Sequence, residues 1–126
     1  LSMAAADVAS MLTQARRLMA DPELARFFDA ACFERALNEW PLVTAAGELR
    51  RVDRIVEFRD EVWVLDYKTG SRAAVAQDEL EAQYRAQVQE YCAALRAVFP
   101  TKRVAGLILF ADGSRIAVEP LASIGR

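Results

Sequence analysis

The sequence contains no histidine, and this absence removes several kinds of chemistry from the chain itself. Ser-His-Asp triads, histidine general bases and histidine metal ligands are all excluded. The only two cysteines, Cys32 and Cys92, lie too far apart in sequence for a zinc or iron–sulfur pattern. We expect both to be small buried hydrophobic residues in apolar helical surroundings, without a disulfide between them.

Long apolar runs are also missing. No stretch of about 18 apolar residues occurs, so we expect no transmembrane segment and no membrane partner. Residues 1–20 carry Asp7, Arg16 and Arg17 inside a helical pattern, and they show neither the apolar stretch nor the cleavage site of a signal peptide. A cytoplasmic location is therefore the expectation.

What remains is the composition of one globular domain. The chain has 126 residues, of which 54% are hydrophobic, enough for a core in a single domain over residues 1–126. The formal net charge is −2, whereas a protein that binds nucleic acid by itself is usually basic. Carboxylates gathered around a cation would lower the formal charge, since the cation is not counted in the sequence. The acidic balance argues against DNA binding without excluding it.

Helical periodicity covers the first forty residues and a later stretch of about 78–99. A first helix precedes Asp21-Pro22, which predicts the start of a second helix with Asp21 as its N-cap. The apolar face of that second helix comprises Leu24, Phe27, Phe28 and Ala31. The later helix carries an apolar stripe of Leu80, Tyr84, Val88, Tyr91, Leu95 and Val98.

Between and after these helices the pattern changes to strands. Residues 40–45, 49–58 and 61–68 predict a three-stranded meander. Residues 104–110 are fully apolar, as in a strand covered on both faces, and Asp112-Gly113 predicts a hairpin turn to a partner strand over 114–118. The order α-α-β-β-β-α-β-β predicts an α/β fold with a mixed central sheet flanked by helices.

Two aspartates and a lysine on the second and third strands are the candidate site. If Arg59 and Asp60 form a two-residue loop, Asp53 lies directly opposite Asp66, and a four-residue loop keeps the same register. A three-residue loop would break this pairing. Lys68 lies two residues beyond Asp66 and therefore shares its face of the sheet.

Opposed carboxylates repel each other, and a bound divalent cation would remove that repulsion. Mg²⁺ prefers a few carboxylate oxygens together with several waters, and it can activate a water and neutralise a phosphate oxygen. Lys68 beside it can stabilise developing negative charge. The alternative is a chance placement of charges on a solvated face. Against it, aspartate is depleted from strands, yet Asp66 ends an apolar run and Asp53 lies between Val52 and Ile55.

Several further residues have two open interpretations. Gln87 and Tyr91 lie one turn apart on the long helix, either contacting phosphates and orienting Lys68 or merely lining the edge of the core. Glu39, at the entry to the first strand, is either an outer carboxylate of the site or a surface residue. Four arginines near the carboxylates are either phosphate ligands or ordinary exposed residues, namely Arg50, Arg51, Arg54 and Arg72.

Taken together, these motifs resemble the RecB-like branch of the PD-(D/E)XK nuclease superfamily, in particular the nuclease domain of AddA- and RecB-type helicase–nucleases. The matching elements are Val52-Asp53-Arg54-Ile55, Val64-Leu65-Asp66-Tyr67-Lys68-Thr69-Gly70 and Tyr84-x-x-Gln87-x-x-x-Tyr91. Glu39 with Pro41 is similar to the E-x-P that precedes the family's first strand. The resemblance spans about residues 39–91.

This resemblance implies a restriction-endonuclease-like core and metal-dependent, exonuclease-type hydrolysis of DNA in double-strand break repair and recombination. It implies Asp53 and Asp66 as ligands of Mg²⁺ or Mn²⁺ and Lys68 as the catalytic lysine. The supporting or DNA-binding residues that it implies are Gln87, Tyr91, Tyr84, Glu39 and Thr69. The expected partners are DNA, an ATP-using helicase domain of the same parent chain, and a second helicase–nuclease subunit.

The chain departs from the family pattern in two ways. A histidine on an upstream helix usually completes the metal site, and this chain has none. Either the chain is a fragment that begins after that helix, which its start inside a helical pattern favours, or the ligand is lost. Arg50-Arg51 stands where the family often has a glycine. The alternative function is therefore a nuclease-like fold that no longer cuts and serves as a DNA-binding or scaffolding module. A third reading is a domain whose carboxylates hold a cation for stability only.

Overall fold

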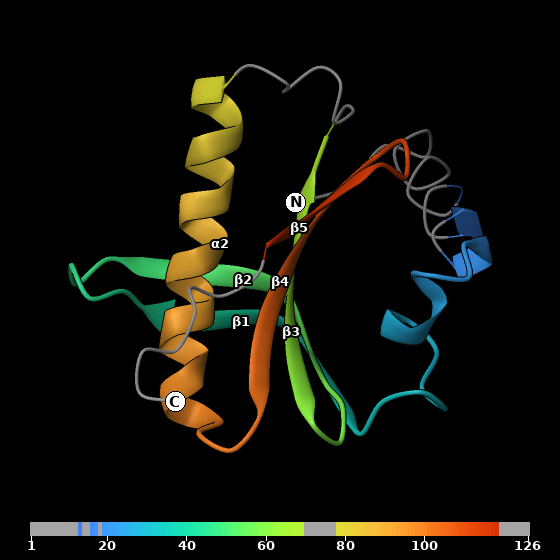
Figure 1. The fold of residues 1–126 in the computed structure, drawn as a ribbon, viewed down its shortest axis with the longest axis horizontal. Helices are drawn as coiled ribbons and strands as arrows, with labels where there is room; N and C mark the ends of the chain where they lie inside the picture. Colours follow the sequence, from blue (N-terminus) through green and yellow to red (C-terminus); the bar gives the residue numbers. More distant parts are fainter. Residues whose placement is uncertain (1–12, 14–15, 18, 70–77, 119–126) are drawn as a thin grey trace, which may run out of the picture.

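A computed structural model describes residues 13, 16–17, 19–69 and 78–118, and it shows a five-stranded sheet with a long helix on one side (Figure 1). The strands lie side by side in chain order: β1 (Arg35–Val43), β2 (Leu49–Glu57), β3 (Glu61–Lys68), β4 (Arg103–Phe110) and β5 (Arg115–Val118). Neighbouring strands are antiparallel except β3 and β4, which are parallel because helix α2 (Asp78–Val98) crosses between them. The predicted mixed α/β sheet is confirmed.

The N-terminal region differs from the prediction. The described residues between Thr13 and Ala20 are helical, but the second helix expected from Asp21 is wrong, because the chain forms only a single 3₁₀ turn, η1 (Ala25–Phe27). Asp21 does accept a hydrogen bond from the Glu23 N–H at 2.9 Å, as an N-cap would.

A side chain from β2 ends this turn. In a continuing helix the Phe27 carbonyl would accept the Ala31 N–H. Instead, Nε and Nη2 of Arg54 both donate to the Phe27 carbonyl at 3.1 Å, and the Ala31 N–H donates to Asp29 Oδ1 at 3.0 Å. Phe27 meanwhile packs edge-on against Trp63, with ring centroids 5.3 Å apart. Tertiary contacts have therefore overridden the local helical pattern.

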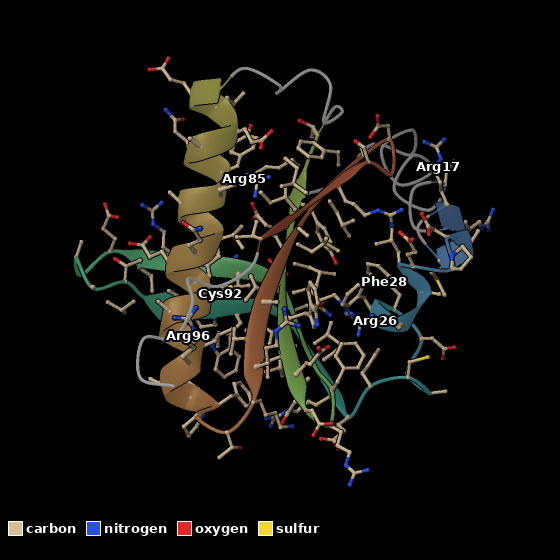
Figure 2. All side chains as sticks on the ribbon, viewed as in Figure 1. Arg17, Arg26, Phe28, Arg85, Cys92 and Arg96 are labelled. Carbon is tan, nitrogen blue, oxygen red and sulfur yellow. The ribbon has the colours of Figure 1, made fainter. Side chains whose placement is uncertain are left out.

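The sheet carries a core on each face. On the α2 side, the helix contributes Val88, Cys92 and Leu95 against valines and isoleucines of the strands. On the other side, residues of the N-terminal segment cover Trp63, Leu65, Leu107 and Leu109. Figure 2 shows Arg26 and Phe28 on this second side and Cys92 and Arg96 on α2. Strand β4 is buried on both faces from Val104 to Phe110, as its apolar run predicted.

Two side chains are more exposed than the sequence predicted. Cys92 is buried within α2, but Cys32 is exposed, because it follows η1 in the connection to β1 and lies outside any helix. Val98, the last member of the predicted apolar stripe, is 59% exposed at the end of α2. No helix among the residues that the structure describes is long and apolar enough to cross a membrane.

Gly106 sets how closely α2 approaches the sheet. A methyl group built on Gly106 would overlap Cγ1 of Val88 and would lie 3.4 Å from Cys92 Sγ. We expect Gly106→Ala to lower the free energy of unfolding by about 1–3 kcal/mol, since helix and sheet must move apart. Val88→Ala removes the overlapping atom, so the double variant should lose less than the two single variants combined. Urea unfolding of all four proteins measures this coupling, and additive losses would contradict it.

Candidate active site

The candidate site lies where the β1–β2 hairpin changes face. Ile55 belongs to the core on the α2 side and Val56 to the core on the other side, as regular alternation requires. By the same alternation Val52 should lie with Val56, but it lies on the α2 side. At this level Glu39 has a φ of 52°, and the β1–β2 ladder omits the Glu39–Asp53 pair. The half of the hairpin next to its turn, from Trp40 and Val52 outward, is therefore rotated relative to the half that contains Asn38 and Arg54.

Asp53 is held beside β3 by its own carboxylate. The β2–β3 ladder pairs Glu57 with Val62 and continues to Arg54 and Leu65, which is the predicted register. The next pair would be Asp53 and Asp66, but the ladder ends before it. Asp53 Oδ2 instead accepts a hydrogen bond from the Tyr67 N–H at 2.8 Å. The carboxylate thus replaces a backbone acceptor, and Asp53 stays next to Asp66 although the strands separate.

Asp66 is the buried carboxylate of the pair, with only 6% of its surface exposed. Its Oδ2 lies 3.1 Å from Lys68 Nζ, but the angles do not form a hydrogen bond, and no donor among the described residues satisfies this buried oxygen. Burial is the main cause that raises the pKa of Asp66 to about 6; the charge of Lys68 opposes this shift and that of the neighbouring Asp53 adds to it. A buried oxygen without a donor, next to a second carboxylate, is suited to a cation.

Lys68 is fixed by contacts from two elements. Besides Asp66 on β3, its Nζ donates to Gln87 Oε1 on α2 at 3.4 Å and lies 4.5 Å from the centroid of the Tyr84 ring. Tyr84 and Gln87 are neighbours on the same face of the helix. Of the two interpretations of Gln87, this contact supports orientation of Lys68. The cation–π geometry assigns Tyr84 the same role.

Tyr91 lies deeper, in the core on the α2 side, with 3% of its surface exposed. Burial raises the pKa of its phenol, and the charges of Asp66 and Asp53 raise it further. The phenol is therefore close enough to sense both carboxylates. The raised pKa keeps the phenol of Tyr91 in its neutral form at physiological pH.

Glu39 and Thr69, which were also expected at the site, have no contact with Asp53 or Asp66 among the interactions of the described residues. Glu39 is exposed, and its Oε1 pairs with Arg51 Nη1 at 3.3 Å. Thr69 is exposed at the end of β3. Within residues 19–69 and 78–118, no set of three or more His, Cys, Asp or Glu side chains is placed to hold a metal ion. Asp53 and Asp66 thus stand without a third such ligand among the described residues.

The arginines that lie near the two aspartates in sequence have different surroundings in the structure. Arg54 turns to the face away from α2, where it binds the Phe27 carbonyl and donates to Asn38 Oδ1 at 2.9 Å. Arg51 pairs with Glu39, and Arg72 lies outside the described residues. Arg50 alone of the described three lines a cleft of about 480 Å³ beside Lys68, together with Gln83, Tyr84, Ala86, Gln87 and Glu90 of α2. Regular alternation from Ile55 would have placed Arg50 on the opposite face, so its position on the cleft depends on the rotation of the hairpin.

Asp53 and Asp66 fit a divalent cation by the chemistry of their donors. The pair offers carboxylate oxygens of the kind that Mg²⁺ and Mn²⁺ prefer, including the buried Oδ2 of Asp66 that lacks a donor. Such a cation, when bound, lowers the pKa of a coordinated water and neutralises charge on a phosphate oxygen. Lys68 adds a positively charged group at the same place, and Gln87 and Tyr84 hold that group in position.

Comparison with known proteins agrees with this geometry. A family model described as the PD-(D/E)XK nuclease superfamily matches residues 7–120. The search of curated proteins returned no match. The chain belongs to the PD-(D/E)XK nuclease superfamily, whose members are mostly nucleases and typically use divalent metal ions. The superfamily part of the resemblance is confirmed, and so is the restriction-endonuclease-like α/β core.

Proposed function

We propose that the chain is a deoxyribonuclease domain that hydrolyses phosphodiester bonds with Mg²⁺ or Mn²⁺. The observation that carries this proposal is the position of Lys68, held between the buried carboxylate of Asp66 and the Gln87 amide at the edge of an open cleft. A lysine with only a structural role would need no such cleft. Membership of a superfamily of nucleases supplies the class of reaction.

The roles follow from the surroundings of each residue. Asp53 and Asp66 would hold the cation, and Lys68 would stabilise negative charge on the attacking oxygen or on the phosphate in the transition state. Gln87 and Tyr84 would keep Lys68 from relaxing onto Asp66 alone. Because Tyr91 is buried in the core within electrostatic range of both carboxylates, it would help to exclude water from that side of the site.

We further propose that this domain works within a longer helicase–nuclease that processes DNA ends in double-strand break repair. The support is the combined resemblance of the Asp66-Tyr67-Lys68 strand and the Tyr84, Gln87, Tyr91 helix to AddA- and RecB-type nuclease domains. In this setting ATP serves the helicase, and DNA is the shared substrate. A longer natural protein containing this domain should then degrade linear DNA faster with ATP than without it.

A second candidate is a nuclease-like fold that binds DNA or a partner without cutting. The observation that favours it is the lack of a third carboxylate, cysteine or histidine beside Asp53 and Asp66 in the described residues. It predicts binding of DNA that does not turn over under any divalent cation. Cleavage by the domain therefore distinguishes the two candidates directly.

Degradation of labelled linear DNA tests the proposal. We expect cleavage in Mg²⁺ or Mn²⁺ and none in EDTA, since the proposed hydrolysis needs the cation to lower the pKa of the attacking water and to neutralise charge on the phosphate. The assay should use single-stranded and double-stranded DNA, because the cleft does not itself select between them. Absence of cleavage with every cation, from a protein shown to bind metal and DNA, would favour the non-cutting module.

A further inference from the structure

Arg50 occupies a special place among the charged residues of the cleft. It comes from β2, across from Lys68 on β3 and from Gln87 and Glu90 on α2. Lys68 is already engaged by Asp66, and the Glu90 carboxylate would repel an entering phosphate. Arg50 is thus a second cation in the cleft, in addition to Lys68, that a phosphate can approach.

The guanidinium of Arg50 is incompletely bonded. Its Nη2 donates to Glu48 Oε1 at 2.7 Å, in an ion pair whose side chains are 39% and 58% exposed. Its Nε is buried and has no hydrogen-bond partner among the residues that the structure describes. A buried donor without an acceptor is unfavourable, and an exposed ion pair contributes little. The weak, exposed pair with Glu48 favours its exchange for a phosphate at Nη2, and the unsatisfied Nε means that the present position of the side chain is not its best-bonded one.

We propose that Arg50 binds a phosphate of the DNA strand that passes through the cleft, and that Glu48 holds Arg50 when DNA is absent. This assignment rests on the proposed nuclease function, and it adds a substrate contact to it. Two oxygens of one phosphate match a pair of guanidinium N–H groups, a bidentate geometry that a lysine does not offer. The contact positions the backbone and is independent of base sequence.

Salt dependence of DNA binding isolates such a contact. Each phosphate neutralised by the protein contributes about 0.9 to the slope of log affinity against log salt for a duplex, and about 0.7 for a single strand. We expect Arg50→Ala to reduce the slope by about that amount. Binding is measured by fluorescence anisotropy with labelled duplex and single-stranded DNA in EDTA, so that no cleavage competes.

Arg103→Ala is the matched control. Arg103 is an ion-paired arginine on the same sheet, but it lies opposite Glu61, whereas Lys68 pairs with Phe110 at the other end of β3 and β4. Its removal changes the net charge equally and should leave the slope unchanged. Arg50→Gln serves as a second variant that keeps a polar side chain, in case the alanine variant does not fold.

Glu48→Gln tests the competition. It should raise the affinity for DNA when Arg50 is present, because Arg50 is released, and it should have no effect in the Arg50→Ala or Arg50→Gln background. An equal rise in both backgrounds would reflect net charge alone and would overturn the proposal. An Arg50→Ala slope equal to that of Arg103→Ala, in a chain that still cleaves DNA, would remove the Arg50 assignment and leave the nuclease function standing. A wild-type chain that neither cleaves nor binds DNA would remove both.

Discussion

Replacing Lys68 with alanine is expected to lower the rate of metal-dependent DNA cleavage by about 10²–10⁴-fold. The side chain ends at the centre of the site, within 3.1 Å of Asp66 Oδ2 and 3.4 Å of Gln87 Oε1. Its loss removes positive charge where negative charge develops in phosphodiester hydrolysis. The fold should survive, because the backbone of Lys68 continues to pair with Phe110. Single-turnover cleavage with saturating cation measures the effect on the chemical step.

Lys102→Ala provides the control, since Lys102 is the only other lysine of the chain. The two side chains are similarly buried, at 22% exposure for Lys68 and 17% for Lys102. Lys102 donates to Glu57 Oε2 at 2.7 Å and to the Phe58 carbonyl at 2.8 Å, so its removal should cost stability. Cleavage per folded molecule should nevertheless be unchanged. Equal cleavage by Lys68→Ala and wild-type protein would exclude Lys68 from the reaction.

The register of the site and strands β2 to β5 were predictable because they depend on local alternation and turn length. Strand β1 was expected only from residue 40, whereas it begins at Arg35, within residues predicted to be helical. The Phe58 N–H donates to the Glu61 carbonyl at 2.7 Å, and the Arg59-Asp60 loop sets the pairing that brings Asp53 toward Asp66. Each strand needs only a period of two and a short connection to fix which side chains share a face. The same reasoning placed Lys68 on the face of Asp66.

The rotation of the hairpin was not predictable, and it decides which arginine serves the cleft. It depends on a positive φ at Glu39, a residue type that shows no preference for that conformation. A regular strand would have put Arg50 and Arg54 on the same face. Instead Arg50 lines the cleft on the α2 side, while Arg54 lies on the opposite face of the sheet and donates to the Phe27 carbonyl. The strain is located beside Asp53, where a functional site would repay it.

The contact between Lys68 and α2 also could not be predicted from the periodicity of the sequence. Periodicity identifies the helix face that carries Tyr84, Gln87 and Tyr91, but the depth at which this face meets the sheet depends on Gly106 and Val88. That close approach brings Gln87 Oε1 within reach of Lys68 Nζ. The resemblance to a family could suggest that Gln87 contacts Lys68. The distance between them, however, follows from the packing of α2 against Gly106 on β4.

Asp66→Asn should make the metal-free protein more stable at neutral pH. The pKa of Asp66 is about 6 in the folded chain and 3.8 as its ordinary value, so the folded state binds the proton more tightly. The contribution of this proton to stability is present below about pH 4 and is lost as the pH rises to about 6. The difference in pKa corresponds to roughly 3 kcal/mol. Asparagine mimics the protonated form at all pH values and avoids this loss.

The test is the unfolding free energy of both proteins in EDTA from about pH 4 to about pH 8. The stability of Asp66→Asn relative to wild type should grow by roughly 3 kcal/mol across that range. Glu57 and Glu61, whose pKa values are lowered by ion pairs and hydrogen bonds, act in the opposite direction, but they act in both proteins and cancel.

Saturating Mg²⁺ or Mn²⁺ at the upper pH should then stabilise the wild-type protein and leave Asp66→Asn nearly unchanged, because a cation that binds only the folded state adds stability that rises with the logarithm of its concentration relative to its dissociation constant. A pH-independent gap would show that burial does not oppose the charge of Asp66. Equal stabilisation of the two proteins by the cation would place the metal elsewhere. The burial that destabilises the charged Asp66 in the metal-free chain is, on this account, what makes the charge of a bound cation stabilising at this position.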